Sequence, residues 1–431
     1  MAGRKFKSLK TALLLSLALV FVFSIVACSS KSGQSSGDGQ VTLVMWSHKD
    51  PGIDEADSQL VADFQAAHPD IKIKFESYPY DEYVQKLKAS FKTSGGPDIA
   101  EFFGTWVAQY AKNDLLEAVP NGKDLIDKYF EAPIGGYVYN GNVYGLPLEY
   151  NIENNGMLAH PQMFKDKGLS YPPKTWDELV SAAQKLTVMD GNNLKVRGFD
   201  FTSYDNVTYL FLALILQQGG NYWGGDGHFN FQSPEAEKAM NELVKLTKEY
   251  KVADYNQMGA ELDGSDYFYK GESAMTYRGP WTIPTGKNVY NVDDFEYVAV
   301  PSFTSNPPSF AAESGWGIVV NKQTKHKEAA MEFLKFASQP DNVMKWNITT
   351  FTVPSLKAVA ENPKYLKQLP MMKAPLSQLQ YGKWIGPIGD RDFMWDTINN
   401  EFPKMASGEV SVKDGLKNLE ETLNKMLDEQ K

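Results

Sequence analysis

The chain has 431 residues, a formal net charge of −10 and 42% hydrophobic residues. That length is typical of two lobes rather than one ordinary core. The acidic balance, with no Lys/Arg stripe, excludes nucleic acid as the expected partner and would repel an anionic membrane surface. The chain is also rich in aromatic residues, with 22 Tyr, 24 Phe and 9 Trp. Because each indole N–H needs a hydrogen-bond partner, we expect some of these rings in a groove rather than in a core.

The first residues have the pattern of a cleaved export signal. Basic residues between positions 4 and 10 precede an apolar run over residues 12–26. This run is shorter than the ~20 residues that a membrane-spanning helix needs. Ile25-Val26-Ala27-Cys28 then resembles the bacterial lipobox, in which the cysteine receives acyl chains such as palmitate and becomes the new N-terminus. We therefore expect a signal peptide over residues 1–27 and lipidation at Cys28, with a signal anchor containing a small buried thiol as the alternative.

The first folded elements are predicted directly after a tether. Residues 28–40 combine the cysteine with a Ser/Gly-rich segment that is typical of a flexible linker. Residues 41–46 have β-type composition, residues 54–67 have helical apolar spacing, and residues 71–75 alternate apolar residues with lysine. The order strand, helix, strand predicts a βαβ unit and therefore a parallel sheet.

Helix signals recur further along the chain. Thr175-Trp176-Asp177-Glu178 has the pattern of a capping box, and Ser233-Pro234 supplies an N-cap followed by a proline at the first helical position. Apolar stripes predict further helices around residues 330–337 and 416–427. Short β-type runs lie at residues 274–277, 297–300 and 317–320. The predicted fold class is α/β.

A series of short motifs occurs in one order along the chain. They are Gly95-Gly96-Pro97-Asp98-Ile99, Tyr144-Gly145-Leu146-Pro147, Pro172 to Leu179, Gln217-Gln218-Gly219-Gly220, Gly271 to Met275 with Gly279-Pro280-Trp281, Ser314-Gly315-Trp316-Gly317, and Ala406-Ser407-Gly408. In this order they resemble the family 1 extracellular solute-binding proteins, the sugar-binding lipoproteins of ABC importers, which are similar to maltose- and oligosaccharide-binding proteins.

The resemblance implies a two-lobed periplasmic-binding-protein fold with a hinge and an inter-lobe cleft. The N-terminal lobe is expected over residues 41–148 with 312–358, and the C-terminal lobe over 149–311 with 359–431. The implied partners are a saccharide and the permease subunits of an ABC transporter, and we expect a monomer held at the membrane by its N-terminal lipid only. No aspartate follows Cys28, so we prefer the outer face of a Gram-positive cell membrane, with periplasmic attachment second.

Aromatic platforms are the main requirement of a sugar site, because sugars have apolar C–H faces ringed by hydroxyl groups. By resemblance, Trp281 after the G-x-W turn and Trp395 ahead of the last two helices are platforms. Two further candidates are Tyr209 and Trp316. Tyr209 lies at the family's spacing before the Gly-Gly loop, and Trp316 follows the point where the chain crosses between the lobes for the second time. Core packing is the alternative for each ring. Glu149 lies where the chain first crosses from one lobe to the other, a place where family members have polar ligand contacts.

Strand ends provide the remaining candidates. In parallel sheets, ligands bind beyond the carboxyl ends of the strands. His48 and Asp50 follow the first strand, with an exposed loop pair as the alternative. Phe103 and Trp106 follow the strand that begins with Pro97-Asp98-Ile99, and alternation allows only one of Phe102 and Phe103 to face the cleft.

Two charged residues complete the predicted site. Arg278 and Glu313 are expected to contact ligand, although a structural ion pair would explain either residue equally well. Trp46 is expected to be a buried ring rather than a platform. Five scattered histidines and one cysteine provide no metal-ligand spacing, so we expect neither a metal nor a cofactor.

Taken together, the sequence predicts an extracytoplasmic substrate-binding lipoprotein of an ABC importer, not an enzyme. It would bind a sugar by hinge closure and deliver it to the permease, and an oligosaccharide is the preferred ligand. A peptide-binding protein is the closest alternative, because fold does not fix ligand, but a peptide site needs charges for both termini. A secreted glycoside hydrolase would need a carboxylate pair about 5–9.5 Å apart, and no motif singles one out. A surface adhesin is the third class and would not require hinge closure.

Overall fold

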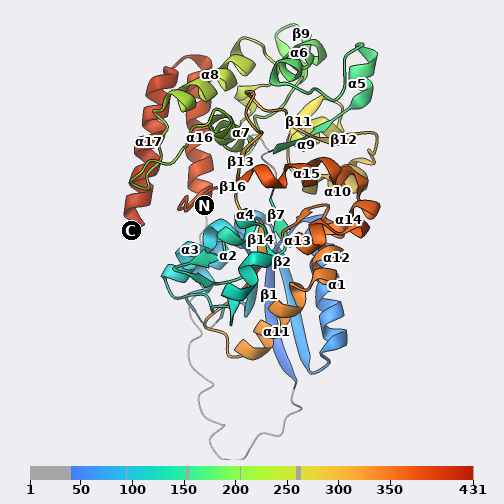
Figure 1. The fold of residues 1–431 in the computed structure, drawn as a ribbon, viewed down its shortest axis with the longest axis vertical. Coiled ribbons are helices and arrows are strands. Elements are labelled where there is room, and N and C mark those ends of the chain that lie inside the picture. Colours follow the sequence, from blue (N-terminus) through green and yellow to red (C-terminus); the bar gives the residue numbers. More distant parts are fainter. Residues whose placement is uncertain (1–39, 94, 152–154, 204, 259–263, 431) are drawn as a thin grey trace, which may run out of the picture. The chain divides into compact units, whose positions relative to one another are not determined.

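The structure is a computed structural model that describes residues 40–93, 95–151, 155–203, 205–258 and 264–430 (Figure 1). The predicted signal peptide, Cys28 and all but the last residue of the tether lie outside these residues. In the described part of the chain, no helix combines the length and the apolar character needed to cross a membrane.

A five-stranded sheet forms the first half of the fold, in the order β2-β1-β3-β14-β6. Its strands are β1 (Val41–His48), β2 (Ile71–Tyr78), β3 (Ile99–Phe103), β14 (Trp316–Val320) and β6 (Leu146–Pro147). β1 pairs in parallel with both β2 and β3, whereas β14 is antiparallel to β3 and β6. Helix α1 (Pro51–Ala67) joins β1 to β2, which confirms the predicted βαβ unit.

Helix α1 begins three residues earlier than the apolar spacing indicates. Asp50 caps it, because the Oδ1 atom accepts hydrogen bonds from the backbone N–H groups of Gly52 at 2.9 Å and Ile53 at 3.3 Å. Pro51 occupies the first helical position, where its missing N–H costs nothing. The helix start thus fixes Asp50 at the carboxyl end of β1.

Helices α1, α2 (Tyr80–Ser90), α3 (Gly104–Lys112) and α11 (Lys327–Ala337) pack against the five-stranded sheet, and α12 (Pro340–Thr350) packs against α1. The buried side chains of this half form one cluster drawn from residues 43–148 and 316–359, which we call the N-terminal core. Trp46 is buried in this cluster, as predicted.

A second cluster of buried side chains, the C-terminal core, is drawn from residues 157–311 and 385–427. It contains residues of the antiparallel sheet β11 (Met275–Tyr277), β8 (Gly156–Ala159) and β12 (Glu296–Ala299). The surrounding helices are α6 (Trp176–Leu186), α7 (Asn206–Gln217), α8 (Pro234–Lys248), α16 (Arg391–Ser407) and α17 (Val412–Glu429). A third cluster of buried side chains combines residues of both predicted lobes, among them Ala132, Tyr150 and Val353. The division into lobes and its boundaries stay a prediction.

Two predicted caps are present at the helix starts. Thr175 Oγ1 accepts from the N–H of Glu178, and Ser233 Oγ accepts from the N–H of Ala236, each at 3.2 Å. The capping box is incomplete, because the Glu178 carboxylate accepts from the N–H of Lys174 rather than from that of Thr175.

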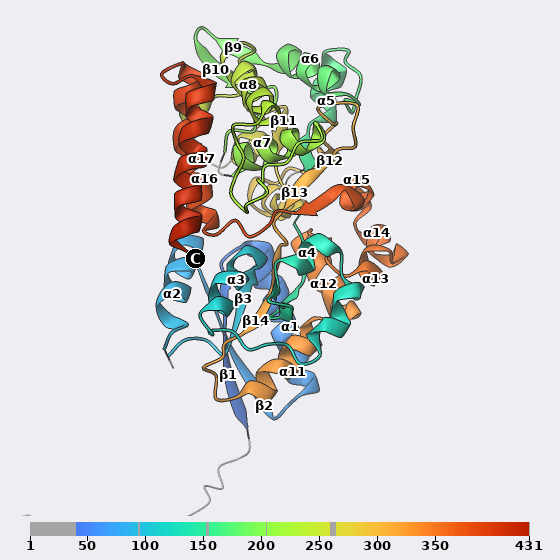
Figure 2. The same cartoon turned by 60° about the vertical axis from the view of Figure 1, so that its left-hand side comes forward.

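Segments between the cores pair with one another. β7 (Glu149–Tyr150) is antiparallel to β15 (Val353–Pro354), and β13 (Phe310–Ala312) is parallel to β16 (Gly382–Trp384). Helices α16 and α17 run side by side, and the C-terminal end of α17 lies beside the N-terminal core, where Lys112 donates to the carbonyl of Gln430 (Figure 2). The remaining short elements are α4 (Glu131–Gly135), β4 (Val138–Tyr139), β5 (Asn142–Val143), α5 (Pro161–Asp166), β9 (Val188–Asp190), β10 (Asn193–Val196), α9 (Gly264–Tyr269), α10 (Ile283–Thr285), α13 (Lys357–Ala360), α14 (Pro363–Gln368) and α15 (Lys373–Gln378).

Candidate functional site

A cavity of about 470 Å³ lies where the two cores meet, which is within the usual range of small-molecule sites. Both cores contribute to its wall. Its rings are His48, Tyr80, Phe103, Trp281, Trp316 and Trp395, its charged and polar residues are Lys49, Asp50, Asp81, Glu149, Asn151, Asp205, Arg278, Thr350, Thr352 and Arg391, and Ile53 and Pro79 complete it.

Most of the predicted site residues line this one cavity. They are His48, Asp50, Phe103, Glu149, Arg278, Trp281, Trp316 and Trp395. The other three lie behind the wall. Trp106 packs edge-on against Trp316 with ring centroids 5.4 Å apart, Tyr209 is 1% exposed, and Glu313 is fully buried. Their placement supports the lining residues rather than direct contact with a solute.

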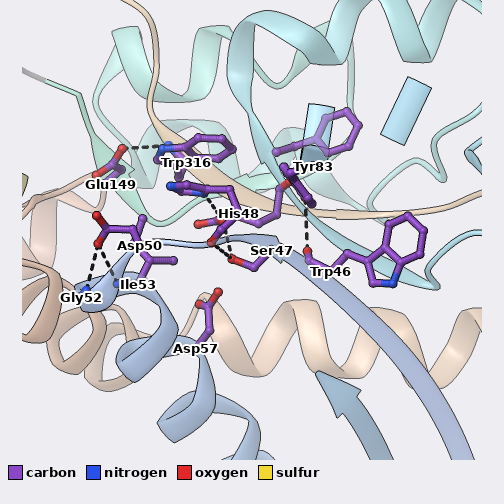
Figure 3. A network of polar contacts seen from close by, with 12 residues as sticks. Trp46, Ser47, His48, Asp50, Gly52, Ile53, Asp57, Tyr83, Glu149 and Trp316 are labelled. Atoms are coloured by element: carbon purple, nitrogen blue, oxygen red, sulfur yellow. Dashed lines mark hydrogen bonds and ion pairs between the residues drawn. The ribbon is translucent and has the colours of Figure 1, made fainter. Parts of the chain in front are cut away.

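Trp316 is the centre of the ring-lined wall on the N-terminal core. His48 stacks on it with centroids 4.1 Å apart at 19° (Figure 3). Phe103 meets it edge-on at 4.8 Å. These residues come together because β1 and β3 both end at this edge of the sheet and the antiparallel β14 begins there. The edge of the sheet that the strand-end argument indicates is thus an edge that lines the cavity.

Glu149 fixes the start of β14 in this wall. Its Oε1 atom accepts from the backbone N–H of Trp316 at 3.0 Å (Figure 3). Burial raises the pKa of Glu149 to about 8, although the hydrogen bond from Trp316 acts in the opposite direction. Burial also raises the pKa of Asp50, which caps α1 beside it. The wall thus presents carboxyl groups whose burial favours the uncharged form.

A buried polar cluster contacts the ring of His48 through its Nδ1 atom. Its Nδ1 atom lies 2.8 Å from Glu101 Oε2, which also accepts from Ser47 Oγ at 2.7 Å. Tyr83 donates to the backbone carbonyl of Glu101. Burial raises the pKa of Glu101 to about 8 and lowers that of His48 to about 4. His48 is therefore an uncharged ring at neutral pH, which suits stacking on Trp316.

Asp57 adds a second buried carboxyl group to this cluster. It is 1% exposed, and its Oδ1 atom accepts from Trp346 Nε1 at 2.8 Å. Burial, and then the nearby Glu101, raise its pKa to about 8. No sequence motif marks Asp57 or Glu101, because each lies inside an ordinary helix or strand.

The wall on the C-terminal core pairs an arginine with a tryptophan. Arg278 donates from Nη1 to Asp205 Oδ1 at 2.9 Å, and its guanidinium carbon lies 4.6 Å from the centroid of Trp281. Trp281 is half-buried and, among the described residues, belongs to no apolar core cluster. Its ring is therefore available to the cavity rather than committed to a core.

The sequence predicts Trp395 ahead of the last two helices. In the structure, Trp395 lies inside α16, the first of these two helices. Asp390 caps α16 by accepting from the N–H of Phe393 at 3.1 Å, so the helix begins four residues before Trp395. The Trp395 indole donates to Tyr209 Oη at 3.1 Å. Tyr209 thus orients a lining ring.

Ten lining residues escape the sequence analysis, and two of them, Tyr80 and Arg391, add an aromatic ring and a buried charge to the site. Tyr80 follows the carboxyl end of β2, so the strand-end rule applied to that strand would have identified it. No sequence motif near Arg391 marks it as a cavity residue, because its environment is formed by rings that are distant in sequence. Its guanidinium carbon lies 3.9 Å from the Phe103 centroid and 4.0 Å from that of Trp395. Glu313 Oε1 lies 3.4 Å from its Nε atom.

Two cores with one large ring-lined cavity between them define a protein built to enclose a small solute. Residues 59–374 match the model of the bacterial extracellular solute-binding protein family, so the chain belongs to that family. It is accordingly a binding protein and not an enzyme. Within the described ranges, no group of three or more His, Cys, Asp or Glu residues is arranged to hold a metal ion.

Individual relatives cover most of the chain. The galactooligosaccharide-binding protein of Bacillus subtilis (strain 168) is 24% identical over 415 residues, covering 93% of each chain. The arabinooligosaccharide-binding protein of the same strain is 27% identical over 375 residues, covering 81% of this chain and 83% of the relative. The solved ABC substrate-binding protein of Listeria monocytogenes in complex with cycloalternan matches with a TM-score of 0.76 at 24% identity, over 90% of this chain and 99% of that one. This likeness confirms the predicted periplasmic-binding-protein fold.

Proposed function

We propose that this protein is the extracytoplasmic receptor of an ABC importer and binds a neutral saccharide, first of all an oligosaccharide. The main support is that rings from both cores line one cavity whose edges contain carboxylates, an amide and arginines. Flat rings suit the apolar faces of a sugar, and the polar groups suit its hydroxyls. The two Bacillus relatives, named for oligosaccharide binding, support the same class.

The energy of binding explains why both cores are needed. A micromolar ligand requires about −8 kcal/mol. One stack that buries ~100 Å² of apolar area contributes about 2.5 kcal/mol, and association itself costs at least ~4 kcal/mol. Two or three stacks plus several polar contacts are therefore required. Trp281 and Trp395 pack with one side of the cavity and Trp316 with the other, so the contacts suffice only when both sides engage the ligand.

The pairing of the arginines favours a neutral solute. Asp205 lies 2.9 Å from Arg278, and Glu313 lies 3.4 Å from Arg391. Each buried guanidinium thus already has a carboxylate beside it, and an additional anion would upset the balance of charge. A peptide, whose two termini need opposite charges, suits this cavity less well than a sugar.

A saccharide panel tests the proposal by thermal unfolding. We expect galactooligosaccharides, arabinooligosaccharides, maltotriose or cycloalternan to raise the melting temperature, because a ligand at 100 times its Kd adds about 2.7 kcal/mol of stability. Oligogalacturonides and a tripeptide mixture are the anionic and peptide controls, and we expect neither to raise it. Chromatography after incubation is expected to recover each sugar intact. A rise with the peptides alone, or consumption of the sugar, would contradict the proposal.

We further propose that acyl chains on Cys28 hold the protein at the outer face of a cell membrane, Gram-positive by preference, as a monomer that docks on permease subunits. One acyl chain anchors weakly, so a multiply acylated cysteine suits stable attachment. We expect Cys28→Ser to move the protein from the membrane fraction to the soluble fraction, whereas the neighbouring control Ser29→Ala stays with the membrane. Retention of Cys28→Ser in the membrane fraction would refute lipid anchoring.

A further inference from the structure

The first turn of α16 joins the two cores at the edge of the cavity. Three consecutive residues at this helix start each contact the N-terminal core, although α16 belongs to the C-terminal core. Asp390 Oδ2 lies 3.8 Å from Lys88 Nζ, the guanidinium of Arg391 lies 3.9 Å from the Phe103 ring centroid, and Asp392 Oδ1 accepts from Tyr80 Oη at 3.1 Å.

Arg391 is the central member of this turn, and its environment comes from both cores. The Phe103 ring, which belongs to the N-terminal core, lies 3.9 Å from the guanidinium carbon. The Trp395 ring, which packs against the C-terminal core, lies 4.0 Å from it. This pair of ring contacts exists only when the two cores are together.

Two of the three guanidinium nitrogens of Arg391 have no hydrogen-bond acceptor in this arrangement. The residue lines the cavity and is 5% exposed, and its Nε and Nη1 atoms are buried without a hydrogen-bond acceptor. Glu313 Oε1, 3.4 Å from Nε, balances the charge without forming a hydrogen bond. Buried donors without acceptors are costly, so an oxygen-rich solute in the cavity would relieve this cost.

The geometry of the guanidinium restricts what it can bind. Because rings lie 3.9 and 4.0 Å from its central carbon, the guanidinium can offer a ligand the N–H groups of its edge. Such an edge donates two parallel hydrogen bonds to a pair of adjacent oxygen atoms. In a neutral saccharide, neighbouring hydroxyl groups supply such a pair.

We propose that Arg391 is a ligand-binding residue that couples recognition to the approach of the two cores. It donates from its edge to adjacent hydroxyl oxygens of a neutral saccharide, and the rings of Phe103 and Trp395 hold it in place only while the cores are together. The ligand half of this proposal rests on the proposed function, whereas the half that concerns the cores does not.

Arg197 supplies a matched control away from the cavity. It is 2% exposed, its Nε atom lies 3.5 Å from Asp200 Oδ2, and its guanidinium carbon lies 3.7 Å from the Tyr267 ring centroid. It thus repeats the combination of a buried arginine, a carboxylate and a ring. Arg197→Lys reports the cost of this chemical change to folding without a change in the cavity.

Isothermal titration of Arg391→Lys tests the ligand half, with galactooligosaccharide and maltotriose as the probes. Lysine keeps the charge but loses the planar fork, so we expect the Kd to rise about tenfold or more. Arg197→Lys is expected to keep the wild-type Kd. A wild-type Kd in folded Arg391→Lys would overturn the ligand contact. Failure of the wild-type protein to bind either probe, or any other sugar, would instead count against the proposed function.

A ligand-free measurement tests the half that concerns the cores. The chain has one cysteine, so a Cys28→Ser background allows dyes at Lys72→Cys and Lys195→Cys, which are exposed positions on β2 and β10. In single-molecule energy transfer without sugar, we expect Arg391→Lys to shift molecules toward lower transfer efficiency and Arg197→Lys to match the wild type. Identical efficiency distributions in the Arg391→Lys variant and the wild type would refute the coupling, whatever the sugar measurements give.

Discussion

Trp281→Ala is expected to weaken saccharide binding by at least about 2 kcal/mol, or roughly 30-fold in Kd, while the protein stays folded. The ring is half-buried, lines the cavity and packs face-on with the guanidinium of Arg278, 4.6 Å from its centroid. A stack on such a platform buries about 100 Å² of apolar area and contributes about 2.5 kcal/mol. Alanine removes the platform, so most of this contribution is lost.

Folding is expected to tolerate this change. Among the described residues, Trp281 belongs to none of the three apolar clusters. The cost of a cavity in a close-packed core, which makes many Trp→Ala changes severe, therefore does not apply in full. We expect unchanged far-ultraviolet circular dichroism and a melting temperature within a few degrees of the wild type.

Trp223→Ala is the matched control for this prediction. Trp223 is also half-buried, but it stacks on Phe229 at 4.5 Å and its Nε1 atom donates to the carbonyl of Ile385, away from the cavity. We expect this variant to lose stability and to keep its affinity for sugar. Calorimetry that finds equal affinities for the wild type and Trp281→Ala would remove Trp281 from the site.

The sequence predicts those parts of the fold that local patterns encode. Alternation over residues 71–75 and the apolar spacing of 54–67 predict the first βαβ unit, because burial of one face dictates both periods. The end of β1 then places His48 at the edge where the cavity lies. Motif order along the chain predicts the family, which no single motif could do.

Contacts between distant residues explain what the sequence does not reveal. Arg391 opens a helix, as many charged residues do, and only the rings of Phe103 and Trp395 make its place distinctive. Asp57 shares the face of α1 that buries Leu60, Val61 and Phe64, so helical spacing predicts its burial but gives no sign of a role for its carboxyl group. Such residues acquire their roles from tertiary packing, which no local period records.

The protein is expected to lose stability as the pH rises toward about 8, and Asp57→Asn is expected to remove part of this loss. Burial, and then Glu101, raise the pKa of Asp57 from its usual 3.8 to about 8. Between these values the unfolded chain releases a proton that the folded protein retains, so the free energy of unfolding falls as the pH rises. The contribution is fully present below about pH 4 and is lost as the pH reaches about 8.

His48 acts with the opposite sign in the lower part of this range. Burial lowers its pKa from 6.5 to about 4, so between these values the unfolded chain binds a proton that the folded protein does not. Stability therefore rises with pH up to about 6.5 from this group. Between pH 6.5 and 8 the protonation of His48 no longer affects stability, whereas the buried carboxyl groups still do. The effect of the carboxyl groups is therefore measured in this pH range.

Urea unfolding of the wild type, Asp57→Asn and Asp63→Asn at pH 6.5 and 8 tests the prediction. A carboxyl group that stays protonated over this window costs at most about 2 kcal/mol, since one pH unit corresponds to about 1.36 kcal/mol. The asparagine of Asp57→Asn keeps an oxygen for the indole of Trp346 and cannot ionise. Between pH 6.5 and 8, the free energy of unfolding of this variant is therefore expected to fall by about 1–2 kcal/mol less than that of the wild type. Asp63 is only partly buried on the same helix, and its hydrogen bond with Lys345 lowers its pKa. It is ionised in both states throughout the window, so Asp63→Asn is expected to follow the wild-type slope. Equal losses in Asp57→Asn and the wild type would show that Asp57 does not retain its proton in the folded protein.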